Sequence, residues 1–289
     1  MLGLRLVGLL TAAFAGEAGS FAEDAALAYL GEARMLPVAD FREVFTAVAE
    51  SAAEVGVVPI ENVSHGTVRE VYDLLLEHSL RIVGEVEVSV RLCLAALPGQ
   101  ALEDIQRVYS HVQALAQAEE FLRARSWMLL ASTNTAGAGK GIADRGERGA
   151  AAVLSPRAAA LHGLAVLARD IHTEPRNRTR FLILARTEAA DRLRPVPVPM
   201  RTTLALSVRN EPGRLVEALG ILAKHDINVS KLESRPSRER DWEYVFWVDL
   251  DGDLCLPTGA PVLTELGEVA ETVRVMGCYP RFASQTAKA

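Results

Sequence analysis

The residues best suited to chemistry in this sequence lie where an apolar run begins near position 180. Thr179 and Arg180 directly precede residues 181–184 (FLIL), a run with the length and composition of a buried strand. A hydroxyl and a guanidinium at the mouth of a rigid strand suit an anionic ligand. The guanidinium offers a planar fork of donors to a carboxylate, and the hydroxyl can donate to a departing oxygen. Taken alone, the stretch fits better a strand that enters a sheet with two polar residues in solvent.

Further polar residues occur at turns that lead from an expected strand towards an expected helix. Backbone N–H groups at a helix start have no partner within the helix, and ligands of open α/β sheets gather beyond the carboxyl ends of strands. Four such turns are therefore expected to face one cleft. They carry Ser20, the group Glu61, Asn62, Ser64, His65 and Thr67, the residue His111, and the hydroxyls of Ser132, Thr133 and Thr135.

Each turn also has a structural interpretation. Ser20 with Glu23 three residues later matches a helix capping box. A lone histidine such as His111 is more often a satisfied structural residue than a ligand-binding one. The small residues of 132–139 fit an N-cap with close helix packing. The glycines of residues 16–21 lack the spacing of the dinucleotide-binding fingerprint.

The elements that position these residues form two patterns. Strands and helices alternate up to residue 184, which predicts two parallel-sheet α/β lobes in a domain of residues 1–187, with crossovers near 81–90 and 172–180. Residues 188–200 contain Pro195, Pro197 and Pro199, so we expect a linker. Residues 201–282 show a βαββαβ order, which predicts a ferredoxin-like sandwich.

Composition sets limits on location and partners. The 289 residues are 49% hydrophobic and 24% charged, as in ordinary globular proteins, and the net charge of -6 argues against nucleic-acid binding. Cys93, Cys255 and Cys278 have no metal-ligand spacing, and an odd number fits a reducing, cytoplasmic compartment. No stretch reaches the length of a membrane span. Residues 1–15 partly resemble a signal peptide, but an N-terminal extension before a buried strand is the favoured interpretation.

Seven short motifs occur in order along the chain. They are residues 16–21 (GEAGSF), 58–62 (VPIEN) with Gly66, 110–115 (SHVQAL), 179–181 (TRF), 210–215 (NEPGRL), 233–236 (ESRP) and 277–280 (GCYP). This ordered set resembles the prephenate dehydratases that carry a C-terminal ACT regulatory domain. The chain departs from the family pattern at Glu17, Val63, Val112 and Arg214, where proline, serine, proline and alanine are usual. Nothing before residue 10 resembles a chorismate mutase segment, so we expect a monofunctional enzyme.

The resemblance implies an α/β fold with a two-lobed catalytic domain like that of periplasmic binding proteins, followed by a ferredoxin-like ACT domain. It implies conversion of prephenate to phenylpyruvate in phenylalanine biosynthesis, with loss of water and carbon dioxide and without a metal or an organic cofactor. Thr179 would donate to the departing hydroxyl, and Arg180 would orient a carboxylate. The residues expected to bind the substrate as donors are Ser20, Asn62, Ser110, His111, Gln113, Thr133 and Thr135, with Ser110 and Thr135 foremost.

The resemblance also implies regulation by L-phenylalanine. The effector would bind where two ACT domains meet in a homodimer or homotetramer, and feedback inhibition requires tighter binding to the less active form. The residues expected at this site are Asn210, Gly213, Leu215, Glu233, Ser234 and Arg235.

Two other functions fit the same pattern. Arogenate dehydratase performs the same chemistry on the aminated substrate. A non-catalytic ACT-containing binding protein would also have two lobes around a cleft, but a pure binder has no need of the Thr179 hydroxyl beside Arg180.

Overall fold

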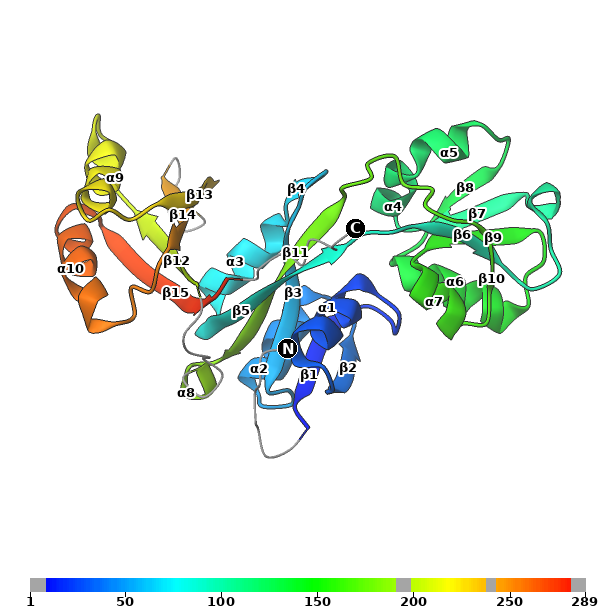
Figure 1. Ribbon diagram of the computed structural model, residues 1–289, viewed down its shortest axis with the longest axis horizontal. Coiled ribbons are helices and arrows are strands. Elements are labelled where there is room, and N and C mark those ends of the chain that lie inside the picture. Colours follow the sequence, from blue (N-terminus) through cyan, green and yellow to red (C-terminus); the bar gives the residue numbers. More distant parts are fainter. Residues whose placement is uncertain (1–8, 191–198, 238–242, 282–289) are drawn as a thin grey trace. The chain divides into compact units, whose positions relative to one another are not determined.

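The computed structural model describes residues 9–190, 199–237 and 243–281 (Figure 1). Within these, the chain divides into two compact units. The first contains residues 9–77 and 86–182, and the second contains residues 78–85 and the described part of 183–289. Residues 1–8, the start of the expected N-terminal extension, lie outside the described ranges. In the part of the chain that the structure describes, no helix is long and apolar enough to cross a membrane.

A six-stranded sheet forms the base of the first lobe. Its order is β2-β1-β3-β11-β5, with β4 paired to β3, and β1 runs parallel to both β2 and β3. The apolar runs of β1 and β3 predict buried strands, and Phe14 is fully buried, as is Phe45 of the neighbouring helix α2. The elements are β1 (Thr11–Ala15), α1 (Phe21–Leu30), β2 (Arg34–Val38), α2 (Phe41–Ala49), β3 (Val55–Asn62), β4 (Gly66–Thr67), α3 (Arg69–Glu77), β5 (Leu80–Ser89) and β11 (Arg178–Arg186).

The second lobe has a mixed sheet rather than the expected parallel one. Its order is β10-β6-β9-β7-β8; β7 is parallel to β8 and β9, whereas β6 is antiparallel to β9 and β10. Parallel neighbours arise from crossover helices, but β6 enters directly from the first lobe, so no crossover sets its direction. The elements are β6 (Cys93–Ala96), η1 (Leu102–Asp104), β7 (Arg107–Ser110), α4 (Val112–Gln117), α5 (Glu119–Arg123), β8 (Met128–Ala131), α6 (Thr135–Arg145), β9 (Ala150–Leu154), α7 (Pro156–Leu161) and β10 (Ala165–Ala168).

The C-terminal sheet confirms the ferredoxin-like prediction. Its strands are antiparallel in the order β13-β14-β12-β15, and α9 and α10 pack together over an apolar core (Figure 1). The elements are β12 (Met200–Ser207), α9 (Arg214–Lys224), β13 (Val229–Pro236), β14 (Tyr244–Asp251), η3 (Pro257–Gly259), α10 (Ala260–Val269) and β15 (Thr272–Pro280). Before it, α8 (Thr187–Ala190) is a short helix in the segment expected to be a linker, and Pro195 and Pro197 lie outside the described residues.

The first half of β5 packs against this sheet within the second unit. Glu85 and Arg201 form an ion pair of 2.5 Å with both side chains almost fully buried. The Arg81 guanidinium donates to the carbonyl oxygen of Val275. A Cβ atom on Gly277 would collide with the carbonyl oxygen of Ile82, so only glycine allows the two backbones to approach this closely.

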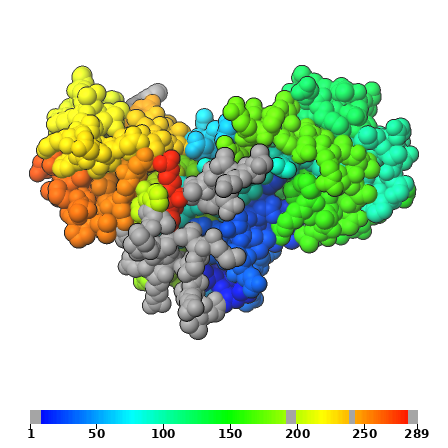
Figure 2. Space-filling model, viewed as in Figure 1, coloured from blue at the N-terminus to red at the C-terminus, as the bar shows by residue number. Residues whose placement is uncertain are grey.

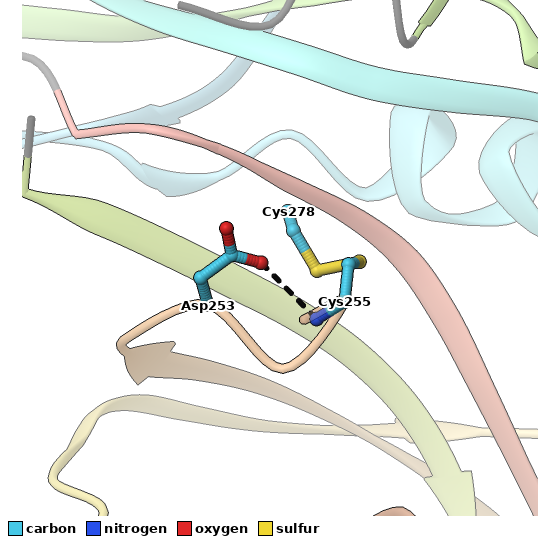
Figure 3. A group of neighbouring side chains, drawn as sticks. All are labelled: Asp253, Cys255 and Cys278. Atoms are coloured by element: carbon cyan, nitrogen blue, oxygen red, sulfur yellow. Dashed lines mark hydrogen bonds between the residues drawn. A yellow bond between two sulfur atoms is a disulfide. The ribbon is translucent and has the colours of Figure 1, made fainter. Parts of the chain in front are cut away.

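A disulfide joins Cys255 to Cys278, whereas the odd number of cysteines suggested a reducing compartment, in which disulfides are rare. The Cα atoms of the two cysteines are 6.1 Å apart, because the loop after β14 returns to β15 (Figure 3). The Asp253 carboxylate accepts a hydrogen bond from the backbone N–H of Cys255 at 3.1 Å. This carboxylate and the two sulfurs lie within 4.8 Å of one another, but a disulfide has no thiolate to offer a metal ion.

We predict that reduction of this disulfide destabilises the C-terminal unit. A cross-link over 23 residues of sequence restricts the unfolded chain and stabilises the folded one by about 3 kcal/mol in the loop-entropy model. Denaturant unfolding with and without dithiothreitol measures the difference. Cys255→Ser should unfold like the reduced protein and no longer respond to reductant. Equal stability of the oxidised and reduced parent protein would contradict the prediction.

Candidate active site

Three polar side chains meet where β3 and β11 lie side by side in the first sheet. Asn62 is the last residue of β3, and its Nδ2 donates to Thr179 Oγ1 at 2.9 Å and to Asn177 Oδ1 at 2.8 Å. Thr179 is 9% exposed and Asn177 is 2% exposed. The TRF motif and the end of the VPIEN motif, more than a hundred residues apart in sequence, therefore form one hydrogen-bonded cluster.

The orientation of the Asn62 amide is fixed by the turn that follows it. Its Oδ1 accepts hydrogen bonds from the backbone N–H groups of Ser64, at 2.9 Å, and His65, at 3.0 Å. The Nδ2 group must therefore face Thr179. A hydroxyl that accepts a hydrogen bond still has its own proton to give. This geometry leaves the Thr179 proton available for an oxygen of a ligand.

Arg180 contacts a carboxylate of its own sheet. Its Nη2 lies 3.3 Å from Oε2 of Glu61, and the Arg180 side chain is only 13% exposed. Adjacent strand residues point to opposite faces of a sheet, so Arg180 and Thr179 do not project in the same direction. Arg180 therefore lies beside a carboxylate of its own sheet at the strand ends.

A cavity of about 630 Å³ lies in the first unit and is lined by both lobes. This volume is typical of small-molecule sites. Four of the seven residues expected to bind substrate line it: Ser20, His111, Thr133 and Thr135. In the space-filling view of Figure 2, the blue of the first lobe borders the green of the second.

Helix starts supply much of the cavity's lining. Ser20 caps α1 by accepting from the Glu23 backbone N–H at 3.3 Å. Asn134 caps α6 by accepting from the Gly137 N–H at 2.6 Å, and Thr135 is the first residue of that helix. The unpaired N–H groups and the positive ends of the helix dipoles favour a carboxylate in such a place.

The glycine turn of the first lobe is held against α7 of the second. Gly19 has φ +87°, and a Cβ there would lie 2.8 Å from the Cα of Ala158, so no other residue fits. Glu23 accepts from the Gly19 N–H at 2.7 Å and pairs with Arg157 at 2.7 Å. The hydroxyl of the buried Ser155 donates to the Gly19 carbonyl at 3.1 Å. These contacts fix the position of Ser20.

The other candidates lie elsewhere. Ser110 is fully buried and its hydroxyl donates to the Val153 carbonyl at 2.6 Å, so it serves the sheet of the second lobe. Gln113 is exposed, and its backbone N–H donates to His111 Nδ1 at 3.3 Å. Asn62, Thr179 and Arg180 belong to the strand-end polar group described above and are not among the residues that line the cavity.

Sequence reasoning missed several lining residues: Asp40, Phe41, Glu70, Asn134 and Ser155. Asp40 could have been found, because it caps α2 directly after β2, the same strand-to-helix position as the other candidates. No sequence signal marks Glu70, because its position in the cavity wall depends on how α3 packs.

The expected effector residues lie in the second unit. Asn210 and Gly213 belong to the turn between β12 and α9, where Gly213 has φ +86°, a conformation that favours glycine. Leu215 is in the first turn of α9. Glu233, Ser234 and Arg235 lie in β13, an edge strand of the sheet.

The family models agree with this architecture. Residues 12–189 match the prephenate dehydratase model, and residues 202–267 match the ACT domain model. The chain belongs to the prephenate dehydratase family. A chloroplastic arogenate dehydratase/prephenate dehydratase of Arabidopsis thaliana is 38% identical to it over 280 residues, which cover 93% of this chain and 72% of the relative.

Solved structures extend the comparison to the whole chain. A prephenate dehydratase from Arthrobacter aurescens in complex with L-Phe has a TM-score of 0.81 and 30% identity, and the match covers 94% of this chain and 90% of that one. A protein called GqqA, described as a novel type of quorum quenching acylase, has a TM-score of 0.82 and 32% identity, with 94% and 98% covered. The prephenate dehydratase fold is thus similar to that of a protein with another described activity.

Proposed function

We propose that this protein converts prephenate to phenylpyruvate. The observation that carries the proposal is the Asn62–Thr179 hydrogen bond, which fixes a hydroxyl with a free proton on a rigid strand. As the ring carboxylate leaves as carbon dioxide, its bonding electron pair enters the ring and the C4–O bond breaks, so the ring becomes aromatic. The departing oxygen gains negative charge, which a hydrogen bond from Thr179 stabilises.

Threonine is too weak an acid to protonate the leaving group by itself. We infer that it acts by position and hydrogen bonding, with solvent as the final proton source. The helix starts at Ser20 and Thr135 would hold a substrate carboxylate. Arg180 would maintain the shape of the strand ends through Glu61.

We further propose that the chain has separate catalytic and regulatory domains. Residues 1–187 would form the catalytic domain and residues 201–282 the regulatory one, joined by residues 188–200. L-phenylalanine would bind between the turn at Gly213 and strand β13 of a second copy, in a homodimer or homotetramer. The left-handed glycine and the edge position of β13 support this proposal.

Incubation of the purified protein with prephenate at neutral pH tests the function. Phenylpyruvate should form, and its absorbance in alkali measures the rate; an uncatalysed blank is needed because prephenate is labile in acid. No turnover of prephenate would move the function to arogenate. Failure with both substrates would leave a binding protein with the dehydratase fold.

One observation favours arogenate as the second candidate. The cavity is lined by the carboxylates of Glu17, Asp40 and Glu70, and none of the described residues that line it is lysine or arginine. An ammonium group is attracted to such a site, whereas a neutral keto group is not. Arogenate carries the ammonium that prephenate lacks, and Glu17 stands where the family usually has proline.

We therefore predict that Glu17→Gln shifts the preference towards prephenate. Because Glu17 is partly exposed, solvent screens the effect, and we expect kcat/KM for arogenate relative to prephenate to fall roughly two- to fivefold. Glu32→Gln, an exposed position outside the lining, is the matched control. An unchanged ratio in Glu17→Gln would remove this carboxylate from substrate selection.

A further inference from the structure

Asn177 has a buried side-chain amide whose oxygen is hydrogen-bonded and whose nitrogen is not. Its side-chain Oδ1 accepts from Asn62 Nδ2 at 2.8 Å, its backbone N–H donates to the Glu174 carbonyl, and its backbone carbonyl accepts from the Val90 N–H. Its Nδ2 is buried and has no hydrogen-bond partner among the residues that the structure describes. An unpaired buried donor costs free energy, so the residue needs another reason to be asparagine.

Turning the Asn177 amide over would not remove this cost. The Asn62 amide is fixed by the two backbone N–H groups that its Oδ1 accepts, so its Nδ2 always faces Asn177. A flipped Asn177 would set two NH2 groups against each other. The acceptor of Asn177 must therefore face Asn62, and its donor is left unpaired.

The Oδ1 atom of Asn177 determines which way the protons of Asn62 Nδ2 point, and so whether one of them reaches Thr179 Oγ1. Asn62 Nδ2 has two protons and three nearby acceptors: Asn177 Oδ1, the Arg178 carbonyl at 3.2 Å and Thr179 Oγ1. When Asn177 takes one proton, it holds the amide plane so that the other points at Thr179. The two backbone N–H groups fix which end of the Asn62 amide is oxygen, but without Asn177 the amide plane can still tilt so that a proton of Nδ2 points at the Arg178 carbonyl instead of Thr179.

We propose that Asn177 is a positioning residue for the dehydration, which acts through Asn62 to hold the Thr179 hydroxyl with its proton free. The unpaired Nδ2 is the cost of having an acceptor at this point. The inference rests on the proposed function, because Thr179 must be the group that assists the departing oxygen. It adds a residue that does not itself touch the substrate.

Asn177→Leu and Asn177→Asp separate positioning from structure. Leucine has a similar size and no acceptor, so kcat should fall about tenfold or more with little change in KM, while the melting temperature stays equal or rises. Aspartate accepts from Asn62 whether or not it is protonated, so its kcat should stay much closer to that of the parent. Parent-like kcat in Asn177→Leu, or equal losses in both variants, would overturn the proposal.

Gln100 offers a matched control in the second lobe. It is 8% exposed, its Oε1 accepts from the Gly149 N–H at 2.6 Å, and its Nε2 also has no partner among the described residues. Gln100→Met should lower the melting temperature and leave kcat unchanged. A fall in kcat comparable to that of Asn177→Leu would show that the loss reflects general destabilisation and would overturn the proposal.

A measurement without substrate keeps the two proposals distinguishable. The side-chain amide signals of Asn62 in a 1H–15N spectrum, assigned with Asn62→Asp, should shift and exchange faster with solvent in Asn177→Leu but not in Gln100→Met. Unchanged Asn62 signals would overturn the positioning role, whatever the activity. If the signals move but the parent protein turns over neither prephenate nor arogenate, the proposed function fails and the hydrogen-bonded arrangement stands.

Discussion

Replacing Thr179 by alanine is expected to lower kcat for the dehydration by about a hundred- to a thousandfold, the usual cost of removing one donor aimed at developing negative charge. The hydroxyl still has a proton to give, because Asn62 Nδ2 already occupies its acceptor side. The fold should tolerate the change, since Asn62 retains Asn177 Oδ1 and the Arg178 carbonyl as acceptors.

The measurement is phenylpyruvate formation by the parent, Thr179→Ala and Thr179→Ser under the same conditions. Serine retains a hydroxyl and should recover much of the rate. Thr264→Ala is the matched control: Thr264 is an exposed threonine of α10 whose hydroxyl donates to its own helix. A rate in Thr179→Ala within a few fold of the parent would remove Thr179 from the mechanism and leave the overall reaction intact.

Removing Glu85 is expected to destabilise the second unit by about 3–5 kcal/mol, because it leaves the charge of Arg201 unpaired in the interior. The Glu85 and Arg201 side chains are 3% and 9% exposed, and their nearest atoms are 2.5 Å apart. In Glu85→Ala the guanidinium of Arg201 would lose its carboxylate while staying away from water. The first half of β5 would then lose its main polar link to β12.

Denaturant unfolding of Glu85→Ala against the parent measures this effect. Glu77→Ala is the control, since Glu77 pairs with Arg42 at 2.7 Å but the two side chains are 35% and 55% exposed. Solvent screens such a pair, so its loss should cost less than about 1 kcal/mol. The double variant Glu85→Leu/Arg201→Leu should recover much of the stability, because no charge is left unpaired. A cost for Glu85→Ala no larger than that for Glu77→Ala would contradict the prediction.

Local pattern determined most of the secondary structure of this protein. The apolar run at residues 181–184 lies in β11, and the alternation after residue 201 folds as the expected ferredoxin-like sandwich. Such signals depend on residues two to four positions apart, which share one face of a strand or helix, so they can be read without knowing the fold. The ordered motifs also identified the family before any contact was known.

The tertiary structure decided the directions of the strands and the partners of the side chains. Nothing near Ser110 in sequence shows that its hydroxyl faces the Val153 carbonyl rather than a ligand, and β6 runs antiparallel to β9 although the local pattern suggested parallel strands. Cys255 and Cys278 meet only because a loop returns to the neighbouring strand. Sequence spacing carries no record of such contacts.

The same division holds at the site. The sequence by itself determined that Asn62 and Thr179 lie near strand ends and have the chemistry to bind an anion. Only the tertiary structure decided that the amide of one holds the hydroxyl of the other, that Arg180 pairs with Glu61, and that carboxylates line the cavity of the first unit. The physical reason is that a hydrogen bond across 117 residues of chain depends on the packing of whole sheets, whereas strand and helix formation depends on near neighbours.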